Sequence, residues 1–185
     1  MATDYPTTAF SRWADGCIQR VGELTSYVWV VLLLVIATNV LMRYAFDQGR
    51  IEFEEIQWHL YSFGFLLGLS YAQQADAHVR VDLIHERLSL RHRAWIELYG
   101  IVLLLLPFIA LILIYSVPFV ADSWASGERS QAPGGLSQRW LVKALLPIGF
   151  ALLLLSTLAR LSRVWACLFP APESRESPDP AADAR

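Results

Sequence analysis

Four long apolar runs, separated by short polar stretches, constrain this chain more than any other feature. They cover residues 24–42, 56–72, 98–121 and 141–159. A helix that crosses a bilayer needs about 20 mostly apolar residues, because each residue adds about 1.5 Å against a hydrocarbon core about 30 Å thick. Of the 185 residues, 55% are hydrophobic and 17% are charged, whereas a soluble domain carries about 25% charged residues. The sequence therefore predicts an all-α integral membrane protein with four transmembrane helices.

The segments that flank this predicted membrane domain (residues 24–169) have a different character. Within residues 1–23, apolar side chains recur every three or four positions as far as the first run, which predicts an amphipathic helix lying at the membrane interface. The first run itself exceeds the 7–15 apolar residues of a signal peptide, and no small-x-small cleavage site follows Met42, so we expect a retained anchor. Residues 170–185 are rich in proline and charge, which predicts a disordered tail.

The basic residues predict how the chain sits in the membrane. The N-terminal segment, the second loop and the C-terminal segment together hold ten Lys and Arg residues, against five in the other two connections. Because basic residues are enriched on the cytoplasmic side, we expect both termini in the cytoplasm of a bacterium and the four helices in its inner membrane.

Several functional classes lack support in the sequence. There is no basic cluster with interleaved aromatic residues, so we expect no nucleic-acid partner. Cys17 and Cys167 lie near opposite ends of the chain without metal-ligand spacing, which argues against a metal site. No predicted span carries an acid at mid-depth or the broken helix of a transporter ion site. We therefore expect no catalytic residue, no cofactor and no enzymatic activity, and a chain that assists a transporter rather than moving the solute itself.

Polar residues at the outer ends of the first two spans are the first site candidates. Arg43 closes the first run, and Glu54 and Glu55 open the second. Helices joined by a short loop run antiparallel, so these groups are expected at similar depth. We hypothesise that Arg43 pairs with Glu55, whose helix face continues through His59 and Ser62. The alternative is that all three charged groups simply reach water. A single histidine near a helix end is more often a hydrogen-bonded structural residue than a ligand.

A second candidate lies in the loop that follows. His78 and Asp82 are four residues apart, so on a helix they would share a face and could pair. The alternative is a solvated turn. Gly64 and Gly68 form a GxxxG pattern, which permits close helix contact but is common in membrane helices.

The order of several short motifs resembles a known family. The series is Arg43-Tyr44-Ala45-Phe46, Glu54-Glu55, Gly68-x-x-Tyr71-Ala72, His78-Val79-Arg80-Val81-Asp82, Gly134-Gly135-Leu136, Arg139-Trp140-x-x-Lys143 and Leu146-Pro147-Ile148-Gly149. Over residues 12–168 this set is similar to the small membrane subunit of tripartite ATP-independent periplasmic (TRAP) transporters, the DctQ-like family. One departure is Ser137, which stands where a proline is expected after Gly-Gly-Leu.

The resemblance implies a small permease subunit of a secondary transporter. In such a system a periplasmic solute-binding protein captures a solute, often an organic acid, and a large membrane subunit carries it with sodium. The small subunit then acts as a scaffold beside the large one and helps to dock the binding protein. On this reading the structural or partner-contact candidates are Arg43, Glu54, Glu55, His78, Asp82, Gly134, Gly135, Arg139 and Lys143.

Two other functions compete with this one. A haem-carrying four-helix anchor of a respiratory complex has a similar size, but it needs axial histidines within the bilayer. Only His59 lies in a predicted span, since His78, His85 and His92 fall in the second loop. A free-standing four-span scaffold is the other alternative.

Overall fold

The structure is a computed structural model that describes residues 5–77 and 88–169. Its long helices are α1 (Ala9–Ala45), α2 (Ile51–Gln74), α5 (Leu106–Ala125) and α6 (Trp140–Leu168), and a shorter helix α4 (Leu90–Gly100) joins α5 through the π-helical turn η1 (Ile101–Leu105). The described residues contain no strand, and one isolated antiparallel pairing joins Arg129 to Ser137. The all-α prediction is therefore confirmed for this part of the chain.

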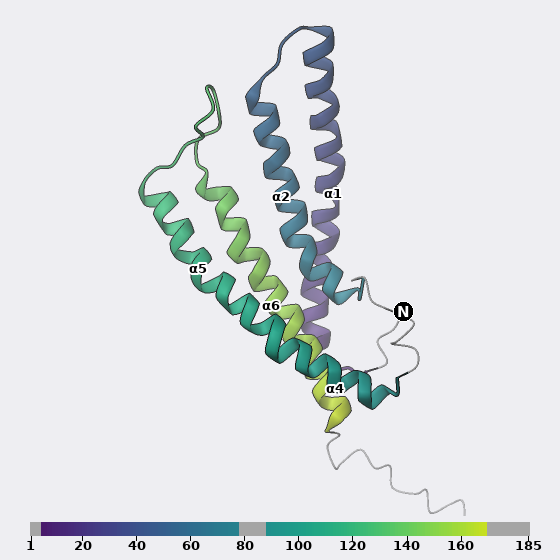
Figure 1. Cartoon of the computed structure of the whole chain (residues 1–185). Coiled ribbons are helices and arrows are strands. Elements are labelled where there is room, and N and C mark those ends of the chain that lie inside the picture. The colour runs from purple at the N-terminus through teal and green to yellow at the C-terminus, as the bar shows by residue number, and fades with distance from the viewer. Residues whose placement is uncertain (1–4, 78–87, 170–185) are drawn as a thin grey trace, which may run out of the picture.

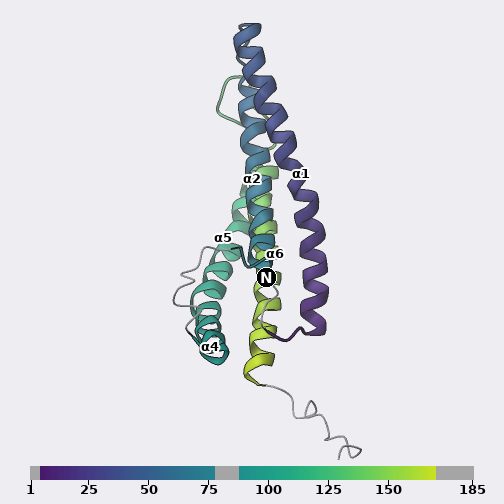
Figure 2. The ribbon, with the colours of Figure 1, turned by 90° about the vertical axis from the view of Figure 1, so that its right-hand side faces the viewer.

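The helices run up and down in sequence order, and α6 lies at the centre of the bundle. Helix α2 lies between α1 and α6, while α5 flanks the other side of α6 (Figure 1). The lower part of α1 and helix α4 lie on opposite sides of α6 (Figure 2). The start of α1 and the end of α6 lie at one end of the bundle, called here the inner end, and the connections 46–50 and 126–139 lie at the outer end.

Three helices are long and apolar enough to cross a membrane among the described residues: Ala9–Ala45, Leu90–Ala125 and Trp140–Leu168. They contain the predicted spans 24–42, 98–121 and 141–159. Helix α2 contains the fourth, 56–72, and its 24 residues would reach about 36 Å. Acids and amides lie in its first and last turns, and no stretch of it is as apolar as those of the three helices named above. A membrane crossing by α2 therefore stays a prediction.

Helix α1 shows no break between the predicted interfacial segment and the first span. It begins at a capping box, in which Thr8 Oγ1 accepts from the backbone amide of Ser11 and the Ser11 hydroxyl oxygen accepts from the amide of Thr8, and it continues for 37 residues. The first 15 residues of α1 thus continue the axis of the span. A position along the membrane surface stays a prediction for this segment.

The third predicted span begins earlier and is less regular than the sequence indicates. Helix α4 starts at Leu90, and the amide of Leu106 donates to the carbonyl oxygen of Ile101, five residues earlier, in the π-helical turn. The next residue is Pro107, which has no N–H to continue the regular bonding pattern. A π-helical turn accommodates this loss without ending the helix.

Glycines allow close contacts where helices cross. A Cβ atom on Gly149 of α6 would lie 2.8 Å from the backbone oxygen of Leu66 in α2. Between α1 and α2, Gly22 lies under the ring of Tyr71, and Gly64 lies under the ring of Trp29. The GxxxG partner Gly68 has no neighbouring atom within 4 Å of such a Cβ. Helix contact therefore uses Gly64 but not the predicted pair.

Candidate functional site

The connection between α5 and α6 folds back onto the first turns of α2 at the outer end. The backbone amide of Ser130 donates to the carbonyl oxygen of Leu136 over 3.1 Å, and the amide of Arg139 donates to the carbonyl oxygen of Glu128 over 3.3 Å. Residues 127–139 therefore form a small hairpin, called here the outer hairpin. Gly134 adopts a φ of 80° at its turn, a conformation that favours glycine.

Glu55 fastens the outer hairpin to α2. Its carboxylate accepts from the hydroxyl of Ser130 and from the backbone amide of Leu136, the latter at 2.5 Å. These two hydrogen bonds hold the pKa of Glu55 below its ordinary value, and the nearby positive charge of Arg139 acts in the same direction. Glu55 is half-buried, whereas Glu54 is exposed. One of the two adjacent acids is thus structural and the other faces outward.

Gly135 makes the approach of the hairpin to Glu55 possible. A Cβ atom at this position would lie 2.5 Å from the Cβ of Ser130 and 2.8 Å from Oε1 of Glu55. At Gly134 it would lie 3.8 Å from Oε1 of Glu52, which is ordinary contact. The Gly134-Gly135 pair therefore serves two purposes, a turn conformation at the first glycine and close packing at the second.

A second interaction fixes the base of the outer hairpin. The ammonium group of Lys143, in the first turn of α6, pairs with the carboxylate of Glu128, and it also lies 4.1 Å from the centroid of the Phe119 ring in α5. The hydrogen bond from Lys143 lowers the pKa of the Glu128 carboxyl group. Arg139, at the start of α6, is exposed. Lys143 thus joins α5, α6 and the hairpin between them.

Arg43 does not join this cluster. Its side chain is exposed, and among residues 5–77 and 88–169 no ion pair links it to Glu54 or Glu55. The hypothesised Arg43–Glu55 pair is not formed because Glu55 bonds the outer hairpin instead. Nδ1 of His59 bonds to the backbone oxygen of Glu55, which is the structural role expected for it.

His78 and Asp82 lie outside the described residues. The predicted pair in the second loop therefore remains a prediction.

The inner end contains a polar network that the sequence analysis missed. Arg160 of α6 pairs with Glu97 of α4 and with Asp76, which follows α2, its Nη1 lying 2.8 Å from Oδ1 of Asp76. One turn further along α6, Arg163 pairs with Asp15 of α1. The two arginine side chains are only 8% and 9% exposed. Arg160 and Arg163 therefore connect α6 to three other parts of the chain.

Smaller polar contacts extend this inner network. Nε2 of Gln74 donates to the backbone oxygen of Asp15 over 3.0 Å, and the hydroxyls of Thr8 and Ser162 are 2.9 Å apart. Tyr5 packs against α4 and α6, and burial together with the adjacent Glu97 raises its pKa. The sequence analysis counted the two arginines only as cytoplasmic charges. Their spacing of three residues, which places them on one helix face, was the available signal.

Comparison with known proteins agrees with this architecture. The sequence model of the family described as "Tripartite ATP-independent periplasmic transporters, DctQ component" matches residues 32–167. No curated protein sequence matches the chain. The family match spans most of the chain and includes the second part of α1, helices α2, α4 and α5, the outer hairpin and the arginines of α6 described above. The chain therefore belongs to the DctQ family, a membrane component of tripartite ATP-independent periplasmic transporters.

Proposed function

We propose that this chain is the small permease subunit that supports the large membrane subunit of its transporter. The observation that carries the proposal is the outer hairpin, which Glu55 and Lys143 join to three helices. A surface that is attached at several points suits a scaffold. In this function the large subunit carries an organic acid or related solute together with sodium, and the small subunit stays fixed beside it.

Docking of the periplasmic solute-binding protein is the second part of the proposal. The outer hairpin exposes Arg129 and Arg139, while its own acid, Glu128, is paired with Lys143. Electrostatic attraction between exposed arginines and an acidic partner surface would speed association and fix its orientation. The hairpin thus supports a role in docking, with the outer end facing the periplasm.

Reconstitution tests the scaffold function directly. Proteoliposomes with the large subunit, this chain and the binding protein should show sodium-driven uptake, and those with this chain and the binding protein alone should show none. Arg129→Glu combined with Arg139→Glu should lower uptake most at low binding-protein concentration, without loss of the membrane complex. Uptake by this chain without the large subunit would refute the scaffold function.

The orientation has its own test. We propose four spans with both termini in the cytoplasm of the bacterial inner membrane. A membrane-impermeant maleimide added from the periplasm should label a cysteine introduced at the exposed positions Gln131 or Ser137, but not Cys17 or Cys167. Labelling of the two native cysteines in permeabilised cells is the control. Periplasmic labelling of Cys17 or Cys167 would reverse the orientation.

A further inference from the structure

Two groups of tryptophans mark two levels along the bundle. The outer group is Trp58, Trp124 and Trp140, in which the last two rings lie 4.4 Å apart between centroids. The inner group is Trp13, Trp95 and Trp165, of which Trp95 and Trp165 both contact the Phe169 ring. Tryptophan is enriched at the two membrane interfaces.

The separation of the two groups agrees with the thickness of a bilayer. Trp140 and Trp165 are both in α6, and their separation in sequence corresponds to about 38 Å along the helix. A bilayer measures about 30 Å across its hydrocarbon core and about 40–45 Å with its headgroups. The outer group therefore marks the outer interface.

Helix α1 continues well past this interface. The contacts of Trp29 with Gly64 and of Gly22 with Tyr71 fix the antiparallel register of α1 and α2. By this register Trp58 of α2 lies level with Val35 of α1. Since α1 ends at Ala45, its last ten residues extend about 15 Å beyond the outer group.

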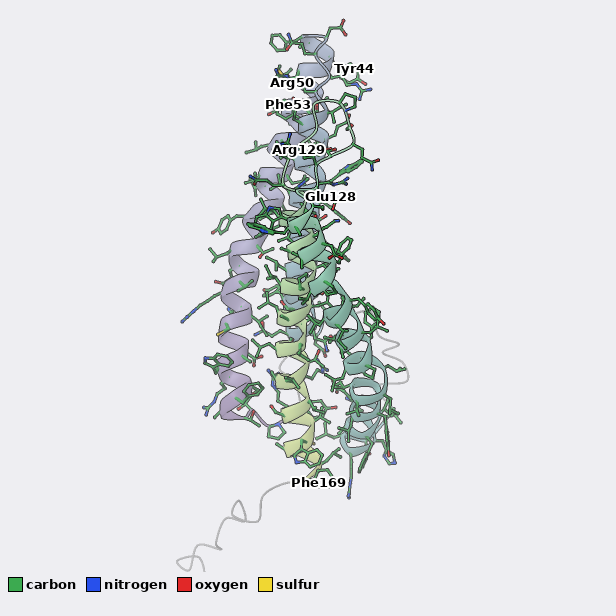
Figure 3. The ribbon with its side chains drawn as sticks, turned by 90° about the vertical axis from the view of Figure 1, so that its left-hand side faces the viewer. Tyr44, Arg50, Phe53, Glu128, Arg129 and Phe169 are labelled. Atoms are coloured by element: carbon green, nitrogen blue, oxygen red, sulfur yellow. The ribbon has the colours of Figure 1, made fainter. Side chains whose placement is uncertain are left out.

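The extension lies at a polar level yet exposes apolar side chains. At the same level α2 carries Glu52 and Glu54. Because charged side chains are costly within the hydrocarbon core, we infer that the core ends below this level. Val40 is nevertheless 50% exposed, Leu41 is 59% exposed and Tyr44 is 82% exposed. Tyr44 lies further out than Glu128 and Arg129 of the outer hairpin (Figure 3). Lipid tails do not reach these residues, and water is an unfavourable environment for them.

Leu41 and Tyr44 belong to a longer stripe that starts inside the bilayer. Called here the α1 stripe, it consists of exposed residues spaced by three or four positions, namely Leu24, Tyr27, Val31, Leu34, Thr38, Leu41 and Tyr44. Thr38 is the one aliphatic residue of the stripe that carries a hydroxyl group. This hydroxyl donates a hydrogen bond to the carbonyl oxygen of Leu34 over 2.8 Å, so it needs no partner from another helix. Such spacing suits packing against another helix over about 30 Å.

We propose that the α1 stripe binds a transmembrane helix of the large membrane subunit that also continues past the outer interface. A soluble binding protein could cover only the extension, and lipid could cover only the part within the bilayer. One membrane-embedded helix covers both parts without interruption. The proposal rests on the scaffold function and names the surface that performs it.

Photocrosslinking in the assembled transporter tests the proposal. The tagged chain carries a photoreactive phenylalanine analogue at Leu34, at Leu41 or at the control position Leu111, which is similarly exposed on α5. The complex is purified from membranes that also contain the large subunit and the binding protein. Leu34 and Leu41 should both give adducts with the large subunit, and Leu111 should give none.

Several results would overturn the proposal. These are adducts of Leu41 with the binding protein or with a second copy of this chain, adducts of the large subunit at Leu111 alone, and absence of any adduct at Leu34 and Leu41. If the large subunit co-purifies without these adducts, the α1 stripe is wrong and the scaffold function stands. If it does not co-purify at all, the scaffold function fails as well.

A substitution supports the crosslinking result. Leu41→Gln should lower recovery of the large subunit by about threefold or more, as expected when a polar side chain replaces an apolar residue that packs in an interface. Leu111→Gln should leave recovery unchanged. Equal recovery in both variants would contradict the proposal.

Discussion

The carboxylate of Glu55 accepts a hydrogen bond from the backbone amide of Leu136, 2.5 Å away and 81 residues further along the chain. This single contact, with the hydroxyl of Ser130 beside it, joins the start of α2 to the connection between α5 and α6. It also accounts for the two adjacent acids at the start of α2. Glu55 holds the outer hairpin, while Glu54 remains exposed and available to a partner.

Removal of the Glu55 carboxylate should release the outer hairpin. In Glu55→Ala the Leu136 amide loses its acceptor, so its hydrogen exchange with solvent should accelerate about tenfold or more. Glu54→Ala is the matched control and should leave exchange at Leu136 unchanged. Hydrogen exchange measured by mass spectrometry on the detergent-solubilised protein distinguishes the two. Equal protection in both variants would show that Glu55 does not hold the hairpin.

Attachment of the outer hairpin should depend on pH. The pKa values of Glu55 and Glu128 are both lowered in the folded protein, by hydrogen bonds from Ser130 and from Lys143 respectively. A lowered folded pKa means that the stabilisation is fully present above the ordinary carboxyl pKa of about 4.3, and is lost as the pH falls through the lower folded value. Protease cleavage within residues 127–139 should therefore remain slow at neutral pH and rise below about pH 4.

The Glu55→Gln variant is the control for this pH effect. Without the Glu55 carboxyl group, cleavage should be faster at neutral pH and should change less on acidification. A wild-type profile that rises instead as the pH increases from 5 to 8 would have the opposite sign and would exclude these two carboxylates as its cause.

The inner network should contribute strongly to stability because its two arginine side chains are buried. Removal of one partner from a buried ion pair typically costs about 3–5 kcal/mol, since the charges that remain lose an interaction that offset their desolvation. Arg160→Ala should therefore lower the free energy of unfolding by a few kcal/mol, measured by denaturant titration in detergent micelles. The exposed Arg129→Ala should change it by less than about 0.5 kcal/mol. Similar small changes in both variants would show that the network is not a stabilising contact.

The crossing of α2 and α6 supplies a paired test with two glycines. Gly149→Ala should destabilise the protein by about 1–3 kcal/mol, because the new methyl group meets the backbone oxygen of Leu66, which cannot rotate away. Gly68→Ala should be neutral or slightly stabilising, because no atom lies within 4 Å of its Cβ position. Thermal unfolding followed by tryptophan fluorescence compares the two. If Gly68→Ala lowered the stability more than Gly149→Ala, the close contact between Gly149 and Leu66 would be contradicted.

The sequence predicted where the long helices lie, but not their full extent or their polar contacts. The apolar runs predicted the helical segments well, because hydrophobic length alone decides which segments can cross a bilayer. The start of α4 at Leu90 and the π-helical turn before Pro107 were missed, since they depend on packing and on the missing N–H of a single proline. The sequence predicted a helix in residues 1–23 that leads into the first span, and the structure joins the two in the single helix α1.

Polar contacts between residues far apart in the sequence were harder to predict than the helices. The sequence analysis gave Glu55 a nearby partner, Arg43, but its actual partners lie far along the chain in the outer hairpin. The resemblance to the DctQ family did point to Gly134 and Gly135 in that hairpin. Arg160 escaped notice because its acids, Asp76 and Glu97, come from two other segments and meet it only when the bundle is assembled.

Affinity purification of the tagged chain from native membranes in a mild detergent tests the central claim most directly. We expect a large polytopic membrane protein to co-purify in a fixed ratio, and the purified complex to show no haem absorbance. A chain that purifies alone from those membranes, or that carries a haem spectrum, would contradict its assignment as the scaffold subunit of a transporter.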